Sequence, residues 1–355
     1  MRYKDLFEYD DLNKEKQEII QTISGLTADN KEDADILDRI WKVLNSGTIS
    51  DNINNAFDIP LADERIGDKQ KVLVRQDMTK ILTTVESDYK SMSNFLKRLE
   101  AGGAVDIGAL SKPLNTFGAV FGDDTAIQAF RKLAAYGVGK NQKGPGEYAL
   151  AAMSNKIRLA DGAGDLEIDG IGKVELKAAM SSSGGRIGYG GGSQKAKQDV
   201  LNKYGNRIPT VIKSINPAGS LGIGPFITAL NDDLPVNDPE NQKVRKAIML
   251  DLLTMDMENY AQGVADTISR TEDPAQIEQA YLAANFEWYK NRDDFDALLI
   301  MSIATGKTAC IKNANELATF RSSGHSKSTA ISIIPTKAGA GREQWAQLTP
   351  NAAKL

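Results

Sequence analysis

The stretch that decides the fold is GDLEIDGIGKVELKAAM, residues 164–180. Apolar and charged side chains alternate along it, and this is the period of a β-strand that buries one face. We therefore predict two strands, with Leu166 and Leu176 among the side chains that point into a core. The segment Gly170-Ile171-Gly172 can join the two strands as a tight hairpin.

The other face of this hairpin is charged. With a three-residue loop at 170–172, the predicted cross-strand pairs are Asp169 with Lys173, Glu167 with Glu175, and Asp165 with Lys177. A pair of glutamates destabilises a plain surface hairpin, whereas a divalent cation would bind such carboxylate oxygens. A shift of register would change these pairs, so a surface hairpin with solvated charges stays open as the alternative.

Helical patterns dominate the rest of the chain. Residues 1–103 read as a helical N-terminal region, and 104–355 as a core whose motif spans 144–186. The core carries a helical insertion at about 195–290 and C-terminal strands within 296–335. In that last segment, DALLIMSIATGKTACIKN predicts two strands around a Thr-Gly turn. Strands that bracket a helical insertion predict an α+β or α/β fold with a small mixed sheet and large helical additions.

The composition indicates in which cellular compartment the protein is expected. The chain has 355 residues, and its apolar and charged contents are those of an ordinary globular protein. The single cysteine, Cys310, excludes an internal disulfide and fits a reducing compartment. The charged N-terminus lacks the apolar segment of a secretory signal, and no apolar run has the length of a membrane span. We therefore expect a cytoplasmic protein without a membrane partner.

Charge is distributed unevenly. The formal net charge of −4 argues against indiscriminate wrapping of nucleic acid. Residues 173–213, however, contain eight basic and two acidic side chains. The basic ones are Lys173, Lys177, Arg186, Lys195, Lys197, Lys203, Arg207 and Lys213. This local excess predicts a basic patch, and a solvated helix face is the alternative.

The hairpin resembles the motif of the PD-(D/E)-x-K nuclease superfamily, which has a restriction-endonuclease-like fold. The family pattern is an Asp at a strand end, followed after a turn by a strand of hydrophobic, acidic, hydrophobic and Lys residues. This chain has Gly164-Asp165 and then Val174-Glu175-Leu176-Lys177. Glu147, in GPGEYALAAM, stands on the preceding predicted helix, where the family often adds an acid. Gly164 replaces the family's Pro, and the resemblance covers residues 144–186 only.

The resemblance implies hydrolysis of phosphodiester bonds in DNA. Asp165 and Glu175 would hold Mg²⁺ or Mn²⁺, with Glu147 as a further metal ligand. Lys177 would orient the attacking water and stabilise the developing negative charge. Contacts to DNA phosphates would come from Arg186, Lys195 and Lys197.

A second hypothesis belongs to another class. The chain is also similar in style to tailed-phage proteins that add helices to a nuclease-like core. It could then be a virion or assembly protein with little or no catalysis, found in the host cytoplasm or the virion with phage structural proteins as partners. A cellular DNA-repair or recombination nuclease is a third option. The sequence leaves open DNA against RNA, endo- against exonuclease, and whether the chain forms a homo-oligomer.

Other candidate motifs give weaker indications of function. The segment ATGKT, residues 304–308, lacks the first glycine of a phosphate-binding loop, because Met301 stands at that position. His325 is the only histidine, and no nucleophile elbow accompanies it. One histidine and one cysteine cannot form a typical zinc site.

Overall fold

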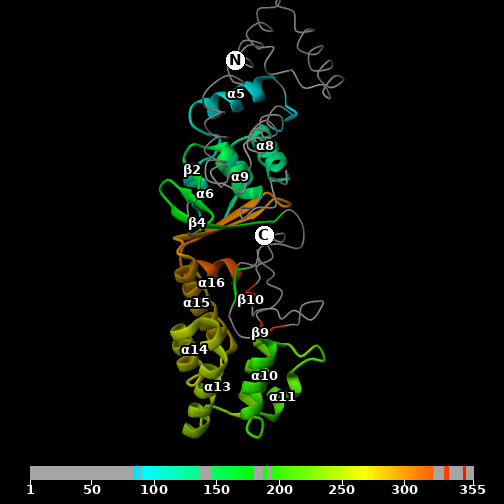
Figure 1. Ribbon diagram of the computed structural model, residues 1–355, viewed down its shortest axis with the longest axis vertical. Coiled ribbons are helices and arrows are strands. Elements are labelled where there is room, and N and C mark those ends of the chain that lie inside the picture. Colours follow the sequence, from blue (N-terminus) through cyan, green and yellow to red (C-terminus); the bar gives the residue numbers. More distant parts are fainter. Residues whose placement is uncertain are drawn as a thin grey trace, which may run out of the picture.

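The computed structural model describes residues 81, 84–87, 89–135, 145–160, 162, 164–179, 187–189, 193–322, 332–335 and 347–348. Within these ranges the protein is a mixed α/β structure, mostly helical, built around a six-stranded sheet (Figure 1). This agrees with the mixed sheet and large helical additions expected from the sequence. No helix in the described ranges combines the length and the apolar character needed to cross a membrane.

The six-stranded sheet has the order β1-β8-β7-β4-β3-β2. Its strands are β1 (Asn115–Thr116), β2 (Ile157–Leu159), β3 (Leu166–Ile168), β4 (Gly172–Ala179), β7 (Ala297–Ser302) and β8 (Lys307–Ile311). β4 and β7 are parallel, and all other neighbouring strands are antiparallel. A parallel pair needs a long crossover, and here residues 180–296 supply it. Two small sheets pair β5 (Ile187–Tyr189) with β10 (Gln347–Leu348) and β6 (Leu221–Gly222) with β9 (Ser332–Ile334).

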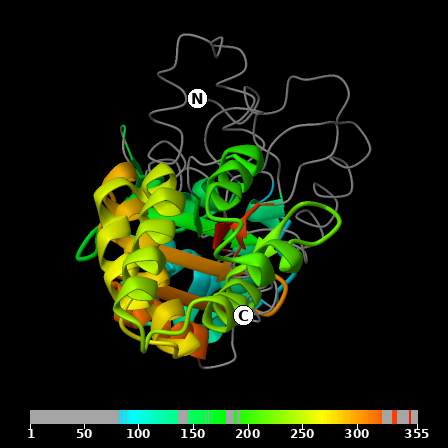
Figure 2. The ribbon, with the colours of Figure 1, turned by 90° about the horizontal axis from the view of Figure 1, so that it is seen from below.

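Helices cover both faces of the six-stranded sheet (Figure 1). The helices that precede β4 are α5 (Tyr89–Glu100), α6 (Ile107–Leu110), α7 (Phe117–Phe121), α8 (Asp124–Ala135) and α9 (Pro145–Met153). Those that follow β4 are α10 (Gln194–Lys203), α11 (Pro209–Ser214), α12 (Ile223–Asp233), α13 (Pro239–Met257), η2 (Glu258–Tyr260), α14 (Ala261–Ile268), α15 (Pro274–Asp293) and α16 (Ala314–Ser322). Seen from below, this later group lies in front of the orange strands of the sheet (Figure 2).

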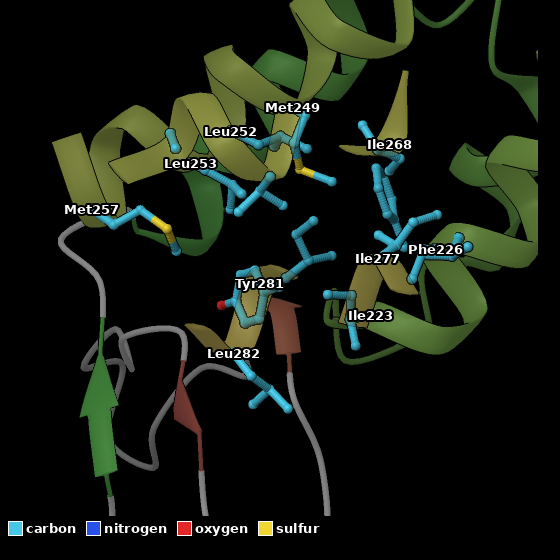
Figure 3. Packing of buried hydrophobic residues seen from close by; sticks show 14 of the residues in the cluster. Ile223, Phe226, Met249, Leu252, Leu253, Met257, Ile268, Ile277, Tyr281 and Leu282 are labelled. Atoms are coloured by element: carbon cyan, nitrogen blue, oxygen red, sulfur yellow. The ribbon is translucent and has the colours of Figure 1, made fainter. Parts of the chain in front are cut away.

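The sheet separates two hydrophobic cores. Every residue of β7 is buried, and successive side chains point to opposite faces. Leu299 and Met301 belong to the first core, beside α5–α9, whereas Leu298 and Ile300 belong to the second. The uninterrupted apolar run of β7 is therefore a strand covered by helices on both faces. Figure 3 shows the second core, where side chains of α12, α13 and α15 meet.

Two long helices of the second core begin at identifiable caps. The carboxylate of Asp238 accepts a hydrogen bond from the Glu240 amide at 2.9 Å, at the start of α13. Asp273 does the same for the Ala275 amide at 2.9 Å, at the start of α15. In both helices a proline follows the cap, where its missing N–H costs nothing. These caps fix the first residues of α13 and α15.

The sequence prediction of two strands within 296–313 is confirmed. β7 and β8 pair in antiparallel fashion, and Leu299 lies opposite Cys310. Gly306 has a φ of +70° in the turn between them, a conformation that glycine adopts without strain. Before the expected boundary at 103, α5 contributes Phe95 and Leu99 to the first core, while residues 1–80 lie outside the described residues.

The predicted register of the β3–β4 hairpin is wrong by two residues. Ile168 lies opposite Gly172 and Glu167 opposite Lys173, so the loop is 169–171 and not 170–172. Gly172 has a φ of +102° and lies in the ladder, with the Asp296 carboxylate against its backbone. The expected contact between Glu167 and a second glutamate is therefore absent from this hairpin.

Candidate functional site

Glu175 and Lys177, two of the three charged residues of β4, lie on the face of the second core. Val174 and Leu176 enter the first core, so Glu175 and Lys177 point to the opposite face. In the parallel register with β7, Glu175 is next to Leu298 and Lys177 next to Ile300. Both neighbours are fully buried. The charged pair therefore interrupts an otherwise apolar face beneath α15.

Asp165 lies where β3 and β4 stop pairing regularly. Its amide donates to the Val174 carbonyl at 2.9 Å, and its carboxylate Oδ2 accepts from the Leu176 amide at 2.8 Å. A side chain thus takes the place of a backbone carbonyl in the ladder. The result is that the Asp165 carboxylate lies against the backbone of the residue that follows Glu175.

A tyrosine from α15 completes this group. The Tyr289 hydroxyl donates to Glu175 Oε1 at 2.7 Å, and Lys177 Nζ forms an ion pair with the same oxygen. The Glu175 and Lys177 side chains are 12% and 22% exposed. The ion pair is therefore partly withdrawn from solvent, where charges interact more strongly than at an open surface.

The charges around Tyr289 converge on its hydroxyl. Burial is the largest cause that raises the pKa of Tyr289, and the charge of Glu175 and its hydrogen bond come next. The charges of Asp293 and Asp165 add to it. Because both Asp165 and Glu175 act on one hydroxyl, the two motif carboxylates lie in a common electrostatic environment. Arg292 stacks beside the ring, 5.2 Å from its centroid, and is held by Asp293.

Glu147 belongs to α9, the helix whose start packs against the other face of β4. A Cβ on Gly146 would lie 2.7 Å from the Ala178 Cβ and 3.5 Å from Leu176, so the start of α9 packs directly on the first-core face of β4. Glu147 is 8% exposed there. In the described part of the chain, no group of three or more His, Cys, Asp or Glu side chains is placed to hold a metal ion. The helix that carries Glu147 thus packs on one face of β4, whereas Glu175 points to the opposite face.

The prediction that Lys197 contacts DNA phosphates is wrong. Lys197 is 0% exposed, forms an ion pair with the equally buried Asp256, and donates to the Ile333 carbonyl at 2.9 Å. A side chain committed to the interior cannot reach a nucleic-acid backbone. Lys195, on the same helix, is exposed. α10 lies toward the end of the molecule formed by α11 and α13, away from β4 (Figure 1). Arg186 lies outside the described residues.

Two features escaped sequence reasoning although periodicity could have indicated them. On α10 the buried residues are Gln194, Lys197, Val200 and Leu201, and this spacing is one helix face. Lys197 thus lies on the apolar face. On α15, Tyr281, Asn285 and Tyr289 recur every four residues on the buried face. This row of polar side chains on an otherwise apolar helix face singles out α15 as a helix whose buried polar groups need hydrogen-bond partners.

Comparison with known proteins adds no relative: no family model matches the chain, and neither curated proteins nor solved structures gave a match.

Proposed function

We propose that the protein is a metal-dependent nuclease with a restriction-endonuclease-like core, and that it hydrolyses phosphodiester bonds of DNA. The observation that carries this proposal is the convergence of Asp165, Glu175 and Lys177 where β3 and β4 part. The chain order supports it as well. Helix α9, the meander β2-β3-β4, the crossover that contains α15, and the parallel strand β7 follow one another along the chain, an order that would suit such a core.

The donor set fits a hard divalent cation. Asp165 and Glu175 offer carboxylate oxygens, which Mg²⁺ and Mn²⁺ prefer, and Glu147 would be a further ligand. A bound Mg²⁺ or Mn²⁺ would supply Lewis-acid activation of water and charge stabilisation at the phosphate. Lys177 would orient the attacking water and stabilise the negative charge that develops. The buried β7 residues Leu298 and Ile300, beside Glu175 and Lys177, keep bulk water from that side of the ion pair.

The test is cleavage of supercoiled plasmid DNA by the full chain with Mg²⁺ or Mn²⁺. Lys177→Met should lower the rate by about 100-fold or more, the usual effect of removing one charge-stabilising donor. Lys173→Met is the matched control, because Lys173 lies on the same strand and face but is exposed and paired with Asp294. Its rate should stay close to wild type. Wild-type protein without metal-dependent cleavage of plasmid, linear or single-stranded DNA would refute the nuclease proposal.

A structural role in a phage particle or its assembly is the second candidate. The burial of Lys197 favours it, because this removes a predicted phosphate contact from an already acidic chain. In that case the fold would serve as a scaffold, and Lys177→Met would change nothing in assembly. Fixed stoichiometry of the chain in purified particles, together with inactive wild-type protein, would select this candidate over the enzyme.

A further inference from the structure

The side chain of Tyr289 is held firmly on three sides. It is 3% exposed, and its ring packs edge-on against Phe295 at a centroid distance of 5.1 Å. Lys177 Nζ lies 6.0 Å from the ring centroid, and the Arg292 guanidinium carbon lies 5.2 Å from it. An aromatic ring fixed by packing and by two cations aims its hydroxyl in one direction.

That direction is Glu175. The hydroxyl donates at 2.7 Å to Oε1, the oxygen that also receives Lys177 Nζ. One donor comes from α15 and the other from β4, so Oε1 is fixed between a helix and a strand. Two donors on one oxygen restrict rotation of the carboxylate plane. Hydrogen bonds of this kind to a charged carboxylate are stronger than those between neutral groups.

We propose that Tyr289 is a positioning residue, which holds the Glu175 carboxylate in the orientation that binds a divalent cation. The inference rests on the proposed nuclease function, because it assigns a role at that same site. Removal of a partner that orients a metal-binding side chain lowers metal affinity by about 10- to 100-fold in general. The same loss is expected of Tyr289→Phe, which keeps the ring and its packing.

Tyr281→Phe is a matched control. Tyr281 lies two turns earlier on the buried face of α15 and is 0% exposed. Among the described residues its hydroxyl has no hydrogen-bond partner. Both variants therefore remove one buried hydroxyl from the same helix face, but only Tyr289→Phe removes a contact to Glu175.

The experiment measures Mn²⁺ binding by the full-length protein, then plasmid cleavage against Mg²⁺ concentration, with thermal unfolding as a check of folding. Tyr289→Phe should weaken Mn²⁺ binding by about 10-fold or more and raise the Mg²⁺ concentration for half-maximal cleavage equally. Near-saturating metal should restore most of the rate. Tyr281→Phe should match wild type in both measurements.

The outcomes separate the two proposals. Wild type that neither binds Mn²⁺ nor cleaves DNA removes the proposed function itself. Wild type that does both, with Tyr289→Phe equal to Tyr281→Phe, removes only the role of Tyr289. If Tyr289→Phe fails to fold, Tyr289→Phe with Glu175→Gln decides: recovery of folding ties the hydroxyl to the Glu175 charge, and continued misfolding overturns the assignment.

Discussion

Replacing Lys197 by Met tests the interior of the second core. The Lys197 and Asp256 side chains are both 0% exposed and form an ion pair. Methionine fills a similar volume without charge, so the change leaves the Asp256 carboxylate buried without its cation. Breaking a buried pair from one side costs about 3–5 kcal/mol. The Ile333 carbonyl also loses its donor, which places the expected loss at the upper part of this range.

The assay is urea unfolding of the full chain, followed by fluorescence and circular dichroism. Lys195→Met is the matched control, because Lys195 is an exposed lysine on the same helix, and exposed changes usually stay within about 0.5 kcal/mol. Lys197→Met with Asp256→Leu should regain most of the lost stability, since an apolar pair can replace a buried ion pair. If Lys197→Met and Lys195→Met lower the unfolding free energy equally, the buried assignment of Lys197 is refuted.

Three further changes probe single interactions by unfolding experiments. Asn285→Leu should leave stability unchanged or raise it, because Asn285 is fully buried and its amide atoms lack hydrogen-bond partners among the described residues; a loss above about 1 kcal/mol would contradict this. Burial, together with the charge of Glu147, raises the pKa of Tyr148 to about 12. Between about pH 10 and 12 the unfolded chain therefore loses the Tyr148 proton more readily than the folded chain does. The free energy of unfolding falls as the pH rises through this range. Tyr148→Phe should reduce that alkaline decline by about 2–3 kcal/mol, and an unchanged slope would count against it. Gly146→Ala should lower stability by about 1–3 kcal/mol, because the added Cβ would lie 2.7 Å from the Ala178 Cβ. Gly263→Ala is the control: an added Cβ there meets nothing within 4 Å, so this change should stabilise α14. Equal effects of the two changes would disprove the close packing of α9 on β4.

The hairpin shows where sequence reasoning succeeds and where it stops. Alternation along 164–180 correctly placed Leu166, Val174 and Leu176 in a core, because the faces of a strand follow from local geometry alone. The register did not follow from it. Ile168 pairs with Gly172, and the Asp296 carboxylate, which receives the Lys173 amide at 2.9 Å, lies against Gly172. That contact comes from the far end of the crossover, which no local pattern contains.

By itself, the sequence determined the strands within 164–180 and 296–313, the mainly helical character of 195–290, and which hairpin side chains face an apolar layer. Periods of two and of 3.6 residues are properties of the backbone, so these features needed no knowledge of distant neighbours. Only the tertiary structure decided which charges meet. Glu175 and Tyr289 are 114 positions apart, and Lys197 and Asp256 are 59 apart. The free energy of a buried charge depends on its partner and on its desolvation, and both are set by the segments that fold over it.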